Sequence, residues 1–122
     1  MYSISKRFAF CASHTLDRLP AEHPCARLHG HNYEVQLVLA SPELDDAGFV
    51  VDYRLLDPFK SYLDSCLDHR HLNDVIGAQP SAERLARWLF DWCTKNLEAS
   101  IVSRLVAVRV SETPKTWAEY RP

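Results

Sequence analysis

The chain has 122 residues, a formal net charge of −2 and 47% hydrophobic residues. This length and composition predict one soluble globular domain over residues 1–122 and exclude a disordered or fibrous protein. The charge lacks the basic excess that nucleic-acid and anionic-membrane partners need, so we expect neither. No apolar run approaches the ~18 residues that cross a bilayer, and the first residues lack the apolar core of a signal peptide. We therefore expect a cytoplasmic protein.

The first third of the chain predicts two strands joined by a loop. Residues 2–14 alternate so that His14 ends an apolar row, which consists of Phe8, Phe10 and Ala12. Residues 15–28 carry prolines and charges without periodicity, which indicates a loop long enough for a functional role. Residues 29–40 predict the second strand. Its apolar residues continue the parity of its two histidines: Tyr33, Val35, Leu37 and Leu39.

A first helix is predicted after a polar connection at residues 41–48. Apolar residues recur at helical spacing over residues 53–67. Two starts fit this helix. Either Asp52 opens it and Pro58 lies in an early turn, or Asp57 caps it and Pro58 takes the first helical position, where proline costs little.

The remaining chain predicts a second loop, a second helix and two more strands. The loop covers residues 68–79, and the helix runs from Pro80-Ser81 to about residue 97. Residues 101–112 again alternate as a strand does. One face carries the apolar residues Val106, Val108 and Val110 and ends with the carboxylate of Glu112. After a turn, residues 116–120 form a last short strand. Because strands and helices segregate in the order ββααββ, we predict an α+β domain with a four-stranded antiparallel sheet and both helices on one face.

Three histidines indicate a metal site. Residues two apart in a strand point the same way, so His29 and His31 can both reach one ion. His14 supplies a third nitrogen if the first two strands pair as a hairpin. Three protein nitrogens leave a fourth position open, as in catalytic zinc sites. Histidines at this spacing are also common on polar surfaces, so the pattern alone does not establish the site.

Cys25 lies on the first loop and allows two interpretations. As a fourth ligand it would close a structural zinc site, whereas as a free thiol beside a metal it would serve as a base or nucleophile, because the metal lowers its pKa. His23 is an alternative ligand, although its place on the loop favours solvent exposure. No Cys-x-x-Cys pair is present, so we expect free thiols, with Cys66 and Cys93 packed on helical faces.

Two further sets of residues are candidates for catalysis or ligand binding. In Asp68-His69, the carboxylate can orient the imidazole and tune its basicity, although sequence neighbours often point apart. We interpret His71 as a surface residue at a helix end, and its role as a partner of this pair stays open. Glu112, directed towards the core, needs hydrogen-bond donors. These come from a salt bridge or from a ligand with a guanidine-like edge.

Taken together, these motifs resemble one family. They are Phe10-Cys11-Ala12-Ser13-His14, Cys25 followed by His29-Gly30-His31, Leu67-Asp68-His69 with Leu72-Asn73, and Ser111-Glu112-Thr113. Over essentially the whole chain they resemble the 6-pyruvoyltetrahydropterin synthase family. The motif Cys-x-Arg-Leu-His-Gly-His resembles that of the bacterial branch of this family, the 6-carboxy-5,6,7,8-tetrahydropterin synthases of queuosine and 7-deazapurine biosynthesis. Two features depart from the family: His71 replaces a frequent tyrosine, and residues 114–122 differ from some relatives.

The resemblance implies a tunnelling fold (T-fold), in which the sheets of a homo-oligomer, a trimer or a dimer of trimers, join into a β-barrel. The active site would lie between subunits. The implied roles are zinc binding by His14, His29 and His31, proton acceptance by Cys25, proton relay by His69 with Asp68, and pterin binding by Glu112.

The implied substrate is 7,8-dihydroneopterin triphosphate, which would yield 6-carboxytetrahydropterin, triphosphate and acetaldehyde. Four basic residues are candidates for the triphosphate: Lys6, Arg7, Arg18 and Arg27. Two alternatives stay open. One is the 6-pyruvoyltetrahydropterin synthase reaction, which releases no acetaldehyde, and the other is a non-catalytic, zinc-stabilised assembly domain.

Overall fold

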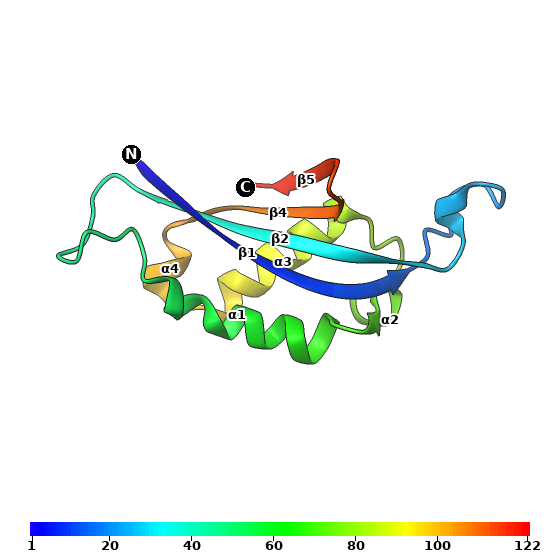
Figure 1. Ribbon diagram of the computed structural model, residues 1–122, viewed down its shortest axis with the longest axis horizontal. Coiled ribbons are helices and arrows are strands. Elements are labelled where there is room, and N and C mark those ends of the chain that lie inside the picture. Colours follow the sequence, from blue (N-terminus) through cyan, green and yellow to red (C-terminus); the bar gives the residue numbers. More distant parts are fainter.

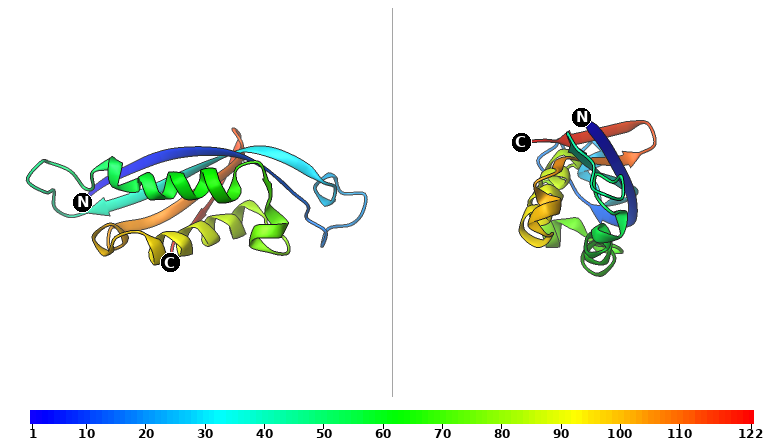
Figure 2. Two further views of the ribbon diagram at one scale, coloured as in Figure 1. Left: turned by 90° about the horizontal axis from the view of Figure 1, so that it is seen from below. Right: turned by 90° about the vertical axis from the view of Figure 1, so that its left-hand side faces the viewer.

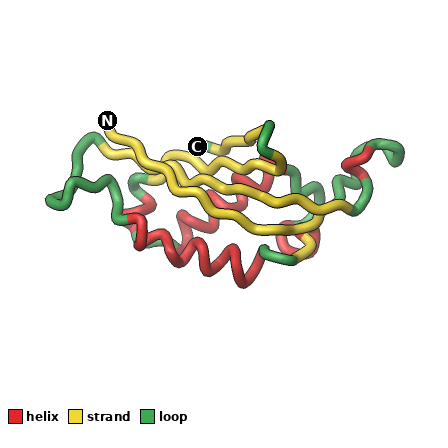
Figure 3. The backbone as a smooth tube through the Cα atoms, viewed as in Figure 1, coloured by secondary structure: helices red, strands yellow, loops and turns green.

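The computed structural model describes all residues, 1–122, as one sheet with helices packed on one face (Figures 1 and 3). The strands are β1 (Tyr2–His14), β2 (His29–Ser41), β3 (Arg70–His71), β4 (Leu105–Thr113) and β5 (Thr116–Tyr120). Their order in the sheet is β3-β1-β2-β4-β5. The β1–β2 hairpin is long and antiparallel, as predicted, and residues 15–28 extend past its end (Figure 1).

The predicted four-stranded antiparallel sheet is wrong in strand number and direction. β3 adds a fifth strand, which pairs in parallel with β1 through Ala12↔Arg70 and Ser13↔His71. Two residues are too few for a period-two pattern, so no sequence signal marks this strand within the second loop. The sheet is therefore mixed, while the α+β class and the placement of the two main helices on one face are confirmed (Figure 2).

The first predicted helix is a continuous helical segment that contains three types of helix. A 3₁₀ turn (Tyr53–Leu56) leads into α1 (Asp57–Tyr62), and a π-helical turn (Leu63–Leu67) follows. Asp52 opens the run, since its side chain accepts from the backbone N–H of Arg54, and Pro58 lies in the first turn of α1. Of the two predicted starts, the one at Asp52 is confirmed.

The helices that follow differ in length from the prediction. α3 (Ala82–Asn96) is capped by the Ser81 side chain. α2 (Leu72–Ile76) and α4 (Ala99–Val102) are short helices that were not predicted. α4 takes the first residues of the strand predicted at 101–112, which begins at Leu105 instead. None of the helices is long and apolar enough to span a bilayer.

The core lies between the sheet and the helices α1 and α3. The predicted apolar rows of β1 and β2 are buried there, as is Cys93, whose burial raises its pKa to about 12. All four cysteines are free thiols. Cys66 is exposed, contrary to the prediction, because it lies in the π-helical turn, where the wider turn places Leu63 and Leu67 on the buried side.

An irregularity in the β2–β4 pairing corrects the predicted apolar row of β4. The register shifts between Val38 and Leu39, so that Leu105 rather than Val106 pairs with Leu39 on the inner face. Beyond the shift, the alternation holds, and Val108 and Val110 are buried. The same alternation carries Glu112 to the inner face at the far end of the strand.

A candidate metal centre and its surroundings

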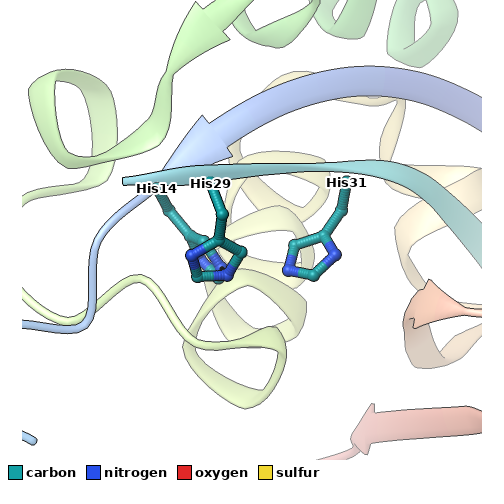
Figure 4. Close-up of side chains that lie close together, drawn as sticks. All are labelled: His14, His29 and His31. Carbon is teal, nitrogen blue, oxygen red and sulfur yellow. Dashed lines mark hydrogen bonds between the residues drawn. The ribbon is translucent and has the colours of Figure 1, made fainter. Parts of the chain in front are cut away.

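Three imidazoles meet on the inner face of the β1–β2 hairpin, at the end where the loop joins the two strands. The register pairs His14 with His29 and Ala12 with His31, which places the three side chains on one face. Figure 4 shows the three rings projecting from the same side of the hairpin. One ring nitrogen of each residue lies within 4.8 Å of the others. The predicted histidines are thus brought together by one chain.

Backbone carbonyls fix the tautomers of two of these rings. His14 Nδ1 lies 2.8 Å from the Pro80 carbonyl, and His29 Nδ1 lies 2.7 Å from the Arg27 carbonyl. A carbonyl only accepts, so both Nδ1 atoms carry the hydrogen and both Nε2 atoms present lone pairs. These two Nε2 atoms face each other at 2.9 Å. Two opposed lone pairs repel, and a cation between or beside them removes the conflict.

His31 provides the third nitrogen. Its Nε2 is buried and has no hydrogen-bond partner, and the nearest acidic oxygen, Glu112 Oε2, lies 3.5 Å away. Burial lowers the pKa of His14 and of His31, which favours the neutral imidazole that binds metals. Three imidazole nitrogens, one of them buried without a partner, fit a metal ion.

Tyr33 supports the cluster, and sequence reasoning missed it. The residue is fully buried, its ring stacks on Phe10 with centroids 5.0 Å apart, and its hydroxyl lies 3.3 Å from His14 Nδ1. Burial raises the pKa of Tyr33 far above its ordinary value, so the phenol stays neutral. The signal was available, because Tyr33 continues the parity of His29 and His31. Such a partner orients a ligating imidazole.

Cys25 lies near the cluster in sequence but outside its set of ligating atoms. It sits in a 3₁₀ turn (Pro24–Ala26), where its backbone N–H donates to His23 Nδ1 at 3.0 Å and its carbonyl accepts from Leu16. The thiol is partly exposed. The His23 ring therefore caps this turn, and it does not join the cluster either.

Asp68 and His69 point towards each other, although sequence neighbours often point apart. Asp68 Oδ2 lies 2.9 Å from His69 Nδ1, and Asp68 Oδ1 accepts from the Cys11 backbone N–H at 2.9 Å. These contacts, that of the Cys11 amide first, lower the pKa of Asp68 below its usual range. His69 has a positive φ of 59°, a costly conformation held by its N–H bond to the Cys11 carbonyl.

The Asp68–His69 pair lies towards the outer face of the sheet, away from the helices. The His69 side chain is 80% exposed and lines a cavity of about 620 Å³ with Cys11, Ser13 and Asn32, whose parity is opposite to that of the metal cluster. The structure therefore does not bring His69 to the three imidazoles within one chain. His71, at the start of α2, is partly buried, and its Nδ1 lies 2.9 Å from Ser13 Oγ. The predicted position at a helix end is confirmed, but the side chain is only partly exposed and contacts Ser13.

Glu112 lies beside the imidazole cluster. Its side chain is 25% exposed and borders a cavity of about 320 Å³, which Glu34, Gly30 and His31 also line. The predicted inward direction of this carboxylate is confirmed. His31 is its only titratable partner within 4.0 Å, so its oxygens are available to donors in the cavity.

The fold and site define an α+β protein with a three-imidazole cluster able to hold a metal ion, next to a carboxylate-lined cavity. A sequence model described as 6-pyruvoyl tetrahydropterin synthase matches residues 3–122. The chain belongs to this family of tetrahydropterin synthases, and the predicted resemblance is confirmed.

Relatives cover nearly the full chain. Two are named 6-carboxy-5,6,7,8-tetrahydropterin synthase. The protein from Synechocystis sp. is 36% identical over 98% of this chain and 93% of its own length. The Bacillus subtilis protein is 32% identical over 99% and 86%, respectively. The solved structure of Caenorhabditis elegans 6-pyruvoyl tetrahydropterin synthase aligns with a TM-score of 0.85 and 25% identity, covering 99% of this chain and 95% of that one.

Proposed function

We propose that this protein is a zinc-dependent 6-carboxy-5,6,7,8-tetrahydropterin synthase. It converts 7,8-dihydroneopterin triphosphate into 6-carboxytetrahydropterin, triphosphate and acetaldehyde in the cytoplasm, as a step towards queuosine or another 7-deazapurine. The observation that carries the proposal is the cluster of three imidazoles beside a carboxylate-lined cavity. The names of the bacterial relatives support the choice of reaction.

His14, His29 and His31 would hold the zinc ion, which would supply Lewis-acid polarisation of the substrate's side-chain hydroxyls. Glu112 binds the pterin. Its two oxygens accept from the 2-amino group and the adjacent ring N–H, a paired arrangement that fixes the ring in one orientation. The 3.5 Å distance between Glu112 Oε2 and His31 Nε2 supports an anchor beside the proposed metal ligands.

Cys25 and His69 move the protons. Cys25 accepts a proton from a side-chain carbon of the substrate, and its partly exposed loop position leaves the thiol accessible to substrate. In His69, Nδ1 faces Asp68, so Nε2 is the nitrogen that gives or takes a proton. Since His69 lies on the outer face, it serves the cluster of a neighbouring subunit in a homo-oligomer whose sheets form a barrel, either a trimer or a dimer of trimers.

Product analysis tests the reaction and its two rivals. Zinc-loaded protein is incubated with 7,8-dihydroneopterin triphosphate, and acetaldehyde is measured by coupled reduction with alcohol dehydrogenase. Triphosphate with stoichiometric acetaldehyde is the expected result. Triphosphate without acetaldehyde would identify the 6-pyruvoyl reaction, which the C. elegans neighbour favours. The absence of both products would favour the non-catalytic assembly domain.

The role of Cys25 is tested by Cys25→Ala. We expect zinc content to be unchanged and turnover to fall by about 10²–10⁴-fold, the usual contribution of a general base. Loss of zinc together with turnover would instead make Cys25 a fourth ligand. Cys66→Ala is the matched control, because Cys66 is an exposed thiol on the π-helical turn and outside the site.

A further inference from the structure

Two cavities of opposite electrostatic character flank the same stretch of β2. The cavity that contains Glu112 has a second carboxylate, Glu34, and no lysine or arginine. The larger cavity contains Arg70 with two imidazoles, His69 and His71, and no carboxylate. Both are lined by residues 30–32, which include the metal-cluster residue His31. The hairpin end is therefore polarised, with acceptors in one cavity and donors in the other.

We propose that Ser13, Arg70 and His71 form the subsite for the triphosphate tail of the substrate. The inference rests on the proposed function, whose substrate has the same polarity. Its pterin end offers N–H donors, its hydroxylated side chain lies in the middle, and its far end is a polyanion. The basic cavity lies on the outer face together with His69, so Arg70 and His71, like His69, would face the cluster of a neighbouring subunit and bind the tail of the substrate held there.

Arg70 is better suited to this anion than the basic residues predicted from sequence. Its guanidinium donates only to the backbone carbonyl of Ser65, so its charge is not offset by a carboxylate. Lys6 is 3.8 Å from Asp57 and Arg7 is 3.5 Å from Glu34, so both charges are already paired. The other two candidates, at positions 18 and 27, line neither cavity. A planar guanidinium also matches phosphate oxygens in a bidentate manner.

The contact between Ser13 and His71 supplies a donor in either tautomer. If His71 Nδ1 accepts from the Ser13 hydroxyl at 2.9 Å, then Nε2 carries a hydrogen that can be donated to phosphate. If Nδ1 donates instead, the Ser13 hydroxyl is free to donate. The carboxylate of Asp68, two residues before Arg70, does not line the cavity, and its oxygens are already bound by the Cys11 amide and His69. Asp68 therefore contributes little electrostatic repulsion to an anion bound in the cavity.

Inhibition by inorganic tripolyphosphate tests the subsite. In the zinc-loaded enzyme, we expect Arg70→Gln to weaken both tripolyphosphate inhibition and the apparent affinity for the triphosphate substrate by at least about 10-fold, as loss of charge-assisted hydrogen bonds requires. Binding of unphosphorylated dihydroneopterin should stay unchanged. Arg70→Lys should recover part of the loss, because it restores the charge without the planar fork. Arg87→Gln is the control, an exposed arginine on α3 that lines neither cavity.

Three outcomes are decisive. Unchanged tripolyphosphate inhibition in Arg70→Gln and in His71→Asn would overturn the subsite, even if the reaction proceeds as proposed. Equal weakening of tripolyphosphate and of unphosphorylated dihydroneopterin would also overturn it, since it would indicate a general disturbance of the site. If the wild type forms no product but binds tripolyphosphate through Arg70, by direct calorimetry, the subsite stands and the proposed reaction fails.

Discussion

The two faces of the β1–β2 hairpin differ in how completely one chain builds them. On the inner face, the rings of His14 and His29 are held by backbone carbonyls, with the buried Tyr33 behind them. On the outer face, His69 is 80% exposed and is fixed mainly through its backbone and Asp68. The inner site is preorganised by core packing, whereas the outer groups remain open to a ligand or a second subunit.

The strongest test of this difference is loss of the inner cluster through His29→Ala. Two nitrogens cannot hold the ion as three do, so we expect zinc affinity to fall by more than about 100-fold, beyond the usual loss for a supporting residue. Competition with a fluorescent chelator measures the affinity. His23→Ala is the matched control, because this imidazole caps the neighbouring turn and should keep zinc. A similar zinc loss in both variants would contradict a cluster limited to three histidines.

A smaller effect is expected from Glu112→Gln. The amide offers one acceptor where the carboxylate offers two, and loss of a charge-assisted bond should lower kcat/KM by about 10–100-fold while zinc stays bound. Steady-state kinetics with metal analysis measures both. Glu34→Gln serves as the control, since this carboxylate borders the same cavity but pairs with Arg7. Equal losses in the two variants would show that the cavity needs negative charge rather than an anchor at Glu112.

The inner face was predictable because its arrangement is a local property of strands. Residues two apart share a face, so the parity of His29, His31 and Tyr33 follows from the sequence once the strand is recognised. Hairpin pairing then brings His14 to them, since a chain leaving one strand through a loop commonly returns beside it. The inward direction of Glu112 followed from the same alternation, even though the irregularity near Leu39 changed the start of that row.

The outer face was not predictable, because it depends on contacts distant in sequence. β3 has two residues, and its position beside β1 comes from pairing across more than fifty residues, which leaves no periodic signal. The Ser13–His71 contact is a consequence of that pairing. The sequence therefore offered Lys6, Arg7, Arg18 and Arg27 without a way to choose among them, whereas Arg70, on the two-residue strand, was not considered.

The smallest effect should appear in the stability of Asp68→Asn at different pH values. The pKa of Asp68 is lowered in the folded protein, chiefly by the Cys11 amide, from an ordinary value of 3.8. A lowered carboxyl pKa adds stability above that ordinary value, and the contribution is lost as the pH falls through the folded-state pKa. Asparagine keeps an acceptor for Cys11 but not the charge. The wild type should therefore be more stable than the variant at pH 7, and the gap measured by urea unfolding should shrink below pH 3.8. A gap that is constant from pH 7 to about pH 3 would mean that the carboxylate charge contributes nothing to the stability of the fold.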